Sequence, residues 1–328
     1  MMKTRLALGA AAFALMLTCP AAAQEVITTP EGAIMESGAS LAYAPGELSD
    51  AQLNGNARHL FRQDSANVFR RFPRELTEEM VNFYVGALGL RSLNPIQLTA
   101  SQQMILTGVG TGQIKLSAGQ EGNRLYNLSG GYAGGTGIRF LVLSYPDADV
   151  VAARFTEAGF TAPHFTARED GTAQALVQDP AGMDIVIVVN PEAADHSDDG
   201  VGVGIQVSNL DASRAFYRDF VGLDELDPVE STLLGTTLYP YAHAETTILL
   251  YKMGDNLPAD TGSSGIQYVV ADAPYVAAMA DHRHVTVETP LNRLRGFDLT
   301  TIWLNDPDGV TNYFAQVGPN SRTARGEN

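Results

Sequence analysis

Cysteine is nearly absent from the sequence, which has a single one, Cys19, among 328 residues. A lone cysteine excludes an intramolecular disulfide framework. Stability therefore has to come from the burial of an apolar core, and the chain is long enough to form two ordinary domains.

Basic residues are also scarce, because 21 Lys and Arg stand against 37 Asp and Glu, which gives a net charge of −16. This balance argues against nucleic acid as a partner, since phosphate-backbone binding needs a basic surface. The negative charge favours solubility and, as ligands, neutral or cationic small molecules.

No apolar run is long enough for a permanent membrane-spanning helix, which needs about 20 residues. The most apolar stretch, Leu6 to Leu17, follows Lys3 and Arg5 and precedes Ala21-Ala22-Ala23. This order predicts a secretory signal peptide over residues 1–23. We therefore expect an exported protein, periplasmic or extracellular, that is not an integral membrane protein.

Two other interpretations of the N-terminus stay open. The apolar run is also compatible with a buried helix, although nothing caps it. Cys19 follows the run and is also compatible with lipid attachment, for which Leu17 and Thr18 are poor neighbours.

The chain repeats itself, and the first pair of repeats is NFYVGALGL at 82–90 and AFYRDFVGLDEL at 215–226. Each segment closes an amphipathic helix with an aromatic pair and a glycine at the helix exit. A second pair begins at Gly137 and Gly265, where apolar alternation leads into an Ala-rich helix.

An Asp-Pro-x-Gly turn follows each member of the second pair, in QDPAGMDIVIVV and NDPDGVTNYFAQV. Proline presets φ in such a turn and glycine supplies its left-handed residue, so a final strand is expected after each. The repeats thus alternate, and four strand-helix-strand units are predicted at about 65–119, 136–190, 201–254 and 264–317.

The acidic connection at 191–200 is the predicted domain boundary. His196 lies there among Asp195, Asp198 and Asp199, and we interpret this cluster as solvated rather than metal-binding, because flexible ligands lose entropy on binding. The sequence thus predicts a signal peptide (1–23), an N-terminal extension (24–64, extended or loosely packed), a first domain (65–190), a linker (191–200), a second domain (201–318) and a tail (319–328).

The pattern VSNLDASRAFYRDFVGL at 207–223, followed by NDPDGVTNYF, resembles the vicinal oxygen chelate superfamily of glyoxalase I, bleomycin resistance proteins and extradiol dioxygenases. The resemblance covers residues 65–317 and implies an α+β fold. Four βαβββ modules would form two domains with cupped mixed sheets. It also implies a divalent metal, held in a cup by His, Glu or Gln of first and last strands, that polarises substrate oxygens.

The positions that match those ligands carry no such residues. In the second half they are Gly202, Gly265, Tyr313 and Ile248 or Leu249. In the first half they are Val68 or Phe69, Lys115, Gly137 and Val186. We therefore expect no metal and no cofactor, which argues against glyoxalase I and extradiol dioxygenase activity.

Side chains two apart on a strand share a face, so other groups are expected to line the cups. The candidate ligand-binding residues are Gln206, Gln267, Tyr313, Arg139 and Tyr251. Amides and phenols beside glycines suit a small organic ligand. No catalytic residue is assigned, because His164, His243, Glu245, His282 and His284 are expected in solvated turns.

Three functions remain open at this point. We favour an exported glyoxalase-like protein, monomer or homodimer, that binds a small organic molecule without the usual metal. The alternatives are an enzyme of the same fold (a lyase, isomerase or ring-opening dioxygenase on an oxygenated or aromatic substrate) and a non-catalytic scaffold with filled cups. A His or carboxylate beside an open pocket would favour the enzyme, and filled cups the scaffold.

Export predicts that the mature protein begins at Gln24, since the Ala-x-Ala site ends at Ala23. Expression in a secreting bacterial host, followed by cell fractionation and intact-mass measurement, checks this. A full-length cytoplasmic product, or a chain that begins at a lipidated Cys19, would contradict it.

Overall fold

The computed structural model describes residues 26–28, 34–38, 41–97, 103–120, 123–193, 200–294 and 297–319. The predicted signal peptide, Cys19, His196 and all of the predicted tail except Pro319 lie outside these residues. Within them, no helix has the length and apolar character needed to cross a membrane.

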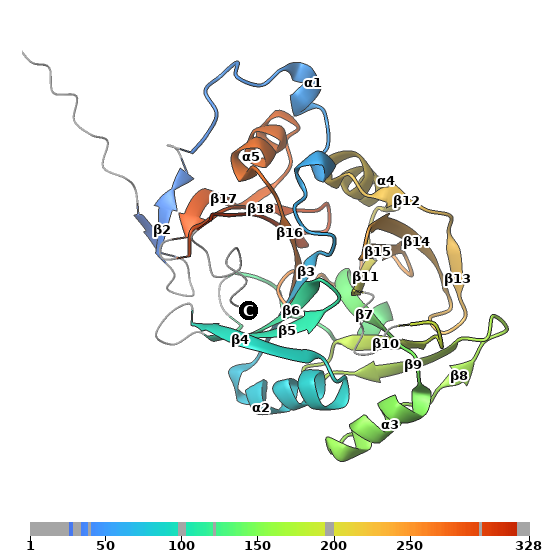
Figure 1. The fold of residues 1–328 in the computed structure, drawn as a ribbon. Coiled ribbons are helices and arrows are strands. Elements are labelled where there is room, and N and C mark those ends of the chain that lie inside the picture. Colours follow the sequence, from blue (N-terminus) through green and yellow to red (C-terminus); the bar gives the residue numbers. More distant parts are fainter. Residues whose placement is uncertain are drawn as a thin grey trace, which may run out of the picture.

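Four modules follow one another between Asn67 and Val317, close to the predicted bounds, and each forms a strand, a helix and further strands (Figure 1). In every module the last strand runs parallel to the first and antiparallel to the strand before it. Module 1 comprises β3 (Asn67–Phe72), η3 (Arg74–Leu76), α2 (Thr77–Val81), the π-helix η4 (Asn82–Ala87), β4 (Arg91–Gln97), β5 (Gln103–Val109) and β6 (Gly112–Ala118). Module 2 comprises β7 (Gly137–Tyr145), α3 (Ala148–Glu157), β8 (Thr166–Ala167), β9 (Ala173–Gln178) and β10 (Asp184–Val189).

Modules 3 and 4 repeat this arrangement. Module 3 comprises β11 (Gly202–Gln206), α4 (Leu210–Ala215), the π-helix η7 (Phe216–Val221), β12 (Asp224–Glu225), β13 (Val229–Ser231), β14 (Thr236–His243) and β15 (Thr246–Tyr251). Module 4 comprises β16 (Ser264–Val269), α5 (Ala273–His282), β17 (Val287–Leu294), β18 (Leu299–Asn305) and β19 (Thr311–Val317).

Local sequence explains where the helices begin and end. Asp147, Asn209 and Asp272 cap α3, α4 and α5, because each side chain accepts a hydrogen bond from a backbone N–H of the first turn. Gly89 and Gly222 follow the two π-helices at φ of +68° and +94°, which glycine adopts without steric cost. The glycines at the predicted helix exits are therefore confirmed.

The modules pair in an order that the sequence did not predict. Module 1 joins module 4 through antiparallel β3 and β16, and module 2 joins module 3 through antiparallel β7 and β11. The described strands form a ten-stranded first sheet and a nine-stranded second sheet. The expected joining of modules 1 and 2 within 65–190, and of 3 and 4 within 201–318, is wrong. Strands pair through backbone groups that all four first strands share, so the repeats alone do not select partners.

Modules 1 and 2, and likewise modules 3 and 4, instead pack through side chains of their helices. The η4 segment of module 1 contacts α3 of module 2, where the Phe83 and Phe155 ring centroids lie 5.7 Å apart. In modules 3 and 4, Phe220 contacts Phe314 at 6.2 Å. The main apolar core thus lies on the helix side of both sheets.

The N-terminal extension is packed, contrary to the expected loose leader. It contains β1 (Val26–Thr28), β2 (Ile34–Ser37), α1 (Asp50–Leu53) and η2 (Ala57–Leu60). Strand β2 pairs with β17 and extends the first sheet. The Tyr43 hydroxyl donates a hydrogen bond to Asp272, the cap of α5, and Leu41 and Leu48 contact the core.

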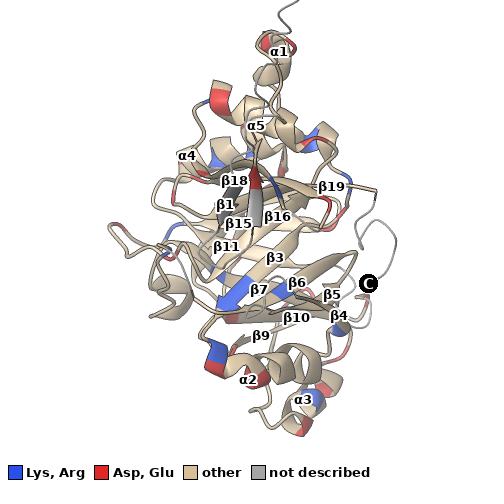
Figure 2. Cartoon of the chain, turned by 90° about the vertical axis from the view of Figure 1, so that its left-hand side faces the viewer, with Lys and Arg blue, Asp and Glu red and all other residues tan. Residues whose placement is uncertain are grey.

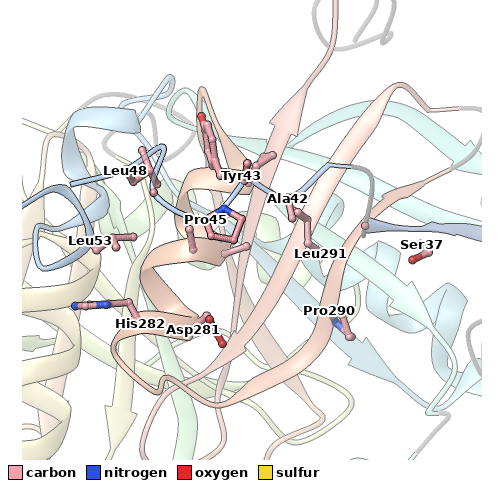
Figure 3. Close-up of a pocket in the computed structure, with 16 residues that line it drawn as sticks. Ser37, Ala42, Tyr43, Pro45, Leu48, Leu53, Asp281, His282, Pro290 and Leu291 are labelled. Atoms are coloured by element: carbon pink, nitrogen blue, oxygen red, sulfur yellow. The ribbon is translucent and has the colours of Figure 1, made fainter. Parts of the chain in front are cut away.

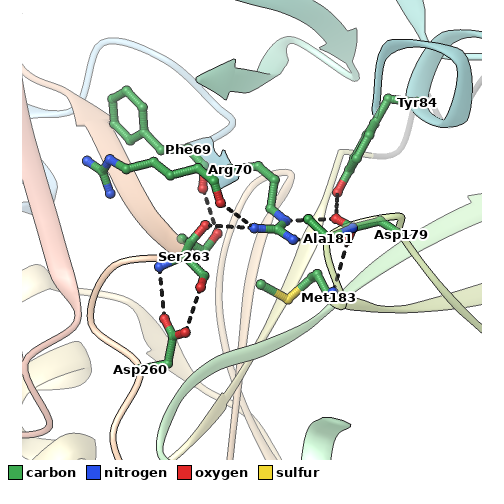
Figure 4. A network of polar contacts seen from close by, with 10 residues as sticks. Phe69, Arg70, Tyr84, Asp179, Ala181, Met183, Asp260 and Ser263 are labelled. Carbon is green, nitrogen blue, oxygen red and sulfur yellow. Dashed lines mark hydrogen bonds and ion pairs between the residues drawn. The ribbon is translucent and has the colours of Figure 1, made fainter. Parts of the chain in front are cut away.

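A buried ion pair joins modules 1 and 2 (Figure 4). The Arg70 guanidinium of β3 donates from Nε and Nη2 to the two carboxylate oxygens of Asp179 at 2.7 and 2.9 Å, and both side chains are at most 1% exposed. Asp179 is the aspartate of the first Asp-Pro-x-Gly turn. It also accepts hydrogen bonds from the Tyr84 hydroxyl and from the Met183 N–H. Burial acts to lower the pKa of Arg70, but Asp179 outweighs it and the pKa is raised.

Modules 3 and 4 repeat this contact without the arginine. Asp306, in the second such turn, accepts hydrogen bonds from the Tyr217 hydroxyl at 3.0 Å and from the Val310 N–H at 2.8 Å. Burial raises the pKa of Asp306 to about 7, and the hydrogen bond from Val310 only partly opposes the shift. A tyrosine from each aromatic pair thus binds the turn of the next module.

We predict that Arg70→Ala lowers the free energy of unfolding by about 3–5 kcal/mol, because it leaves Asp179 as an uncompensated buried charge. Urea unfolding followed by circular dichroism measures this. Arg74→Ala, at an exposed position in η3, is the matched control and should change stability by less than about 0.5 kcal/mol. Equal effects of the two substitutions would show that the ion pair does not hold the modules together.

Candidate functional site

Each sheet curls and presents an inner face on the side away from its helices (Figure 1). Two small clusters of buried apolar side chains, separate from the main core, lie on these faces. The first face has Phe69, Tyr313 and Ala315 as its cluster. The second has Phe140, Val186, Leu234, Leu238 and Tyr251.

The two faces differ in how a phenylalanine lies against a glycine of the strand beside it. On the second face Gly204 is the register partner of Phe140, and a Cβ added to Gly204 would lie 2.2 Å from the Phe140 ring. On the first face Gly265 is the register partner of Phe69. A Cβ added to Gly265 would have the Thr311 carbonyl oxygen at 3.2 Å as its nearest neighbour, and no atom of Phe69 within 3.9 Å. A phenylalanine ring therefore covers the glycine of the second face, whereas the glycine of the first face has Thr311 as its close neighbour and no ring over it.

The connection between modules 1 and 2 covers the second face. Arg139 donates hydrogen bonds to the backbone carbonyls of Asn127, Ser129 and Gly131 at 2.5–3.0 Å. The Tyr251 hydroxyl donates to the Tyr132 carbonyl at 2.6 Å. Arg139 and Tyr251, two of the candidate ligand-binding residues, thus bind the chain itself.

Asp184, which the sequence analysis did not single out, also binds the connection that covers the second face. Its carboxylate accepts hydrogen bonds from the Tyr132 N–H at 2.7 Å and from Gln178 at 3.0 Å. Burial raises the pKa of Asp184. Its position at the start of a predicted strand gave no sign of this role, because its partner comes from a connection distant in sequence.

Gln206 also lies on the second face, beside Tyr251 in the register of β11 and β15. It is fully buried, and neither atom of its side-chain amide has a hydrogen-bond partner among the described residues. A buried amide without hydrogen bonds costs free energy of folding. Because the Gln206 side chain has no exposed surface, it does not offer its amide to a ligand from solvent.

Polar groups gather at the centre of the first face, around Lys115. Its ammonium donates to the Gln267 side-chain carbonyl at 2.5 Å, and the same oxygen accepts from Asn67 at 2.9 Å. The ammonium lies 5.4 Å from the Phe69 ring centroid, and the Arg71 guanidinium lies 5.5 Å from the same centroid. Burial lowers the pKa of Lys115 to about 8.

An aromatic wall adjoins this polar centre. Tyr313 is the register partner of Gln267, and its ring centroid lies 5.6 Å from Phe69 and 5.2 Å from Trp303. Burial raises the pKa of Tyr313, so the phenol is neutral at physiological pH. Gln267 and Tyr313 are therefore the two candidate residues that the structure brings together on the first face.

A second basic group is already paired. Arg124 forms an ion pair with Glu288 at 2.8 Å and lies 5.3 Å from the Trp303 ring centroid. Glu288 also accepts a hydrogen bond from Thr311 at 2.6 Å. Figure 2 shows basic residues in the central strands and acidic residues mainly on helices and loops.

The divalent metal that the resemblance implies does not fit the first face. Lys115, Phe69 and Gly265 are register neighbours there, although the sequence assigned them to ligand positions of two different domains. They offer an ammonium, an aromatic ring and no side chain, so a second cation would meet repulsion instead of ligands. No group of three His, Cys, Asp or Glu that could hold a metal occurs in the described part of the chain.

The remaining acid–base candidates lie away from both inner faces. His164, His282 and His284 are exposed, as expected. His243 ends β14 and is half-buried against the Phe61 ring at 5.0 Å, so the expected solvated turn is wrong for this residue. Glu245 accepts hydrogen bonds from the backbone and side chain of Thr111.

A further hollow of about 560 Å³ lies outside both cups, between the N-terminal extension and α5 (Figure 3). Its walls are mostly apolar and include Leu48, Leu53, Pro290 and Leu291, with Asp281 and His282 at one side. It contains no convergent set of polar groups comparable to that around Lys115.

No family model matches the chain, and no curated protein does. Solved structures match it closely in shape. Glyoxalase I from Zea mays aligns with a TM-score of 0.60 at 16% identity, over 79% of this chain and 94% of that one. A candidate dioxygenase from Bacillus subtilis aligns with a TM-score of 0.54 at 14% identity, over 79% and 87%. The chain therefore has the vicinal oxygen chelate fold.

The contrast between the faces predicts different costs for the same substitution. Gly204→Ala should lower the free energy of unfolding by about 1–3 kcal/mol, because the new methyl group collides with the Phe140 ring. Gly265→Ala should change it by less than about 1 kcal/mol, because the new methyl group meets no ring and its tight contact with Thr311 at 3.2 Å is relieved by a shift of a few tenths of an ångström. Denaturant unfolding of both variants measures this, and equal losses would show that the first face is filled as well.

Proposed function

We propose that this protein is an exported binding protein that holds a small organic molecule on the inner face of the first sheet, without a divalent cation. The observation that carries the proposal is the difference between the two faces. The second is filled by Phe140 and closed by the 127–132 connection. The first has no ring over Gly265, where an added Cβ would meet the Thr311 carbonyl oxygen at 3.2 Å, and directional polar groups and an aromatic wall lie beside this glycine.

The lining favours binding over the enzyme alternative. Acid–base chemistry needs groups of tuned pKa that can reach a substrate, and among the described groups of this face Lys115, with a pKa lowered to about 8 by burial, has no second acid or base free beside it. Glu288 is occupied by Arg124 and Thr311, and Tyr313 holds its proton tightly. The filled second face supports the scaffold alternative for that half of the molecule only.

Pairing within the chain supports a monomer. All four first strands already have a partner strand from another module. A homodimer would have to use a different surface, and it remains the second option for the assembly.

Metal-independent binding is tested on chelator-treated protein. A thermal-shift screen of aromatic acids, aromatic amides, amines and dicarbonyls should yield compounds that raise the Tm by several degrees, through preferential binding to the folded state. Added Zn²⁺ or Mn²⁺ should not increase the effect. Binding that requires a metal ion would favour the enzyme, and a screen without hits would favour the scaffold.

A second measurement locates the bound compound. Trp303 is the one tryptophan of the sequence and belongs to the first face. A hit should change its fluorescence, whereas compounds bound elsewhere should leave it unchanged.

A further inference from the structure

Lys115 has fewer partners than its ammonium can use. The group has three N–H donors. Its one hydrogen bond to a described residue goes to the Gln267 carbonyl oxygen. Within the described ranges no carboxylate lies at ion-pair distance from Lys115. A desolvated ammonium with a single neutral acceptor gains from any anion that reaches it.

The described side chains around Lys115 carry a local charge that is opposite in sign to the net charge of the whole protein. Among the described residues, the basic side chains of Arg71, Lys115 and Arg124 lie on or beside the first face together with the acid Glu288. These described groups give a local excess of positive charge, in a chain whose net charge is −16. At short range and low dielectric the neighbouring charges dominate over distant, screened ones. The net charge had favoured neutral or cationic ligands, and the local arrangement favours the opposite sign.

The space next to Lys115 suits a flat apolar group. No aromatic ring lies over Gly265, and Phe69, Tyr313 and Trp303 flank the polar centre with ring faces and edges. Aromatic rings stack offset or edge-to-face with centroids about 4.5–7 Å apart, so a planar ligand would find partners on this wall.

We infer that the first face selects organic monoanions, with a carboxylate received by Lys115 and a planar apolar body packed against Phe69, Tyr313 and Trp303. The inference rests on the proposed function and adds the chemical class of the ligand. Gln267 positions the ammonium, since its carbonyl is itself held by Asn67.

The experiment compares benzoate with benzamide, which has nearly the same shape but no charge. Both are titrated into chelator-treated protein at pH 7 while Trp303 fluorescence is recorded, with calorimetry as the second readout. Benzoate should bind at least about tenfold more tightly than benzamide, since hydrogen bonds between charged groups are the stronger ones.

Variants of Lys115 test whether this residue causes the preference for benzoate over benzamide. Lys115→Met should abolish the preference for benzoate and leave benzamide binding unchanged. Lys252→Met, at an exposed lysine paired with Asp255, is the matched control and should behave as wild type. Lys115→Arg keeps the positive charge, so it should retain the preference for benzoate. If Lys115→Met does not fold, Lys115→Arg still tests the inference through its pH dependence.

The pH dependence gives a separate signature. The pKa of Lys115 is lowered to about 8, so the group is charged at pH 7 and mostly neutral at pH 9. Benzoate affinity should fall about tenfold between these values while benzamide affinity stays constant. In Lys115→Arg the benzoate affinity should not change over this range, because arginine remains protonated.

The outcomes separate this inference from the proposed function. Equal binding of benzoate and benzamide, or a preference that survives Lys115→Met, overturns the inference and leaves ligand binding intact. If no compound of any charge alters Trp303 fluorescence up to about 10 mM, both fail. The inference is supported if the wild type prefers benzoate and loses this preference as the pH rises from 7 to 9. Lys115→Met, but not Lys252→Met, should then lack the preference at pH 7.

Discussion

The buried ion pair between Arg70 and Asp179 fixes how consecutive modules sit against each other. It joins a first strand to the Asp-Pro-x-Gly turn of the next module, and Tyr84 adds a hydrogen bond to the same carboxylate. Tyr217 and Asp306 repeat the contact in the second half. These contacts hold module 1 against module 2 and module 3 against module 4, while the first strands pair module 1 with module 4 and module 2 with module 3. Each sheet is consequently assembled from one module of each half of the chain.

This assembly lets the two faces diverge within one chain. The connection from module 1 to module 2 lies across the second face, where Arg139, Asp184 and Tyr251 bind its backbone. Buried polar groups need partners, and here the chain supplies them. On the first face Lys115 and Gln267 bind each other instead, and the ammonium has donors that no described residue uses. The second face is thus closed by the chain itself, and the first face is the one proposed to bind a ligand.

The chain is similar to glyoxalase I in its fold, and proteins that share a fold can have different functions. The first face has an ammonium and a phenol where the resemblance implies metal ligands. Its local positive charge also outweighs, at short range, the negative charge of the chain as a whole. Both points favour recognition of an organic anion by fixed hydrogen-bond donors over activation of a substrate by a metal.

The sequence by itself determined the four modules, their approximate bounds, the glycines at two helix exits and the turns before two last strands, because these features depend on residues a few positions apart. It also placed Gln267 and Tyr313 on one inner face, since strand alternation is local. Only the tertiary structure decided which modules pair, because backbone pairing does not distinguish four similar first strands. It alone showed that Arg139 and Tyr251 bind the chain itself, and that Lys115, which the sequence placed only at a ligand position without a ligating group, lies at the centre of the first face. Such roles depend on what covers a face, and that comes from segments far away in the sequence.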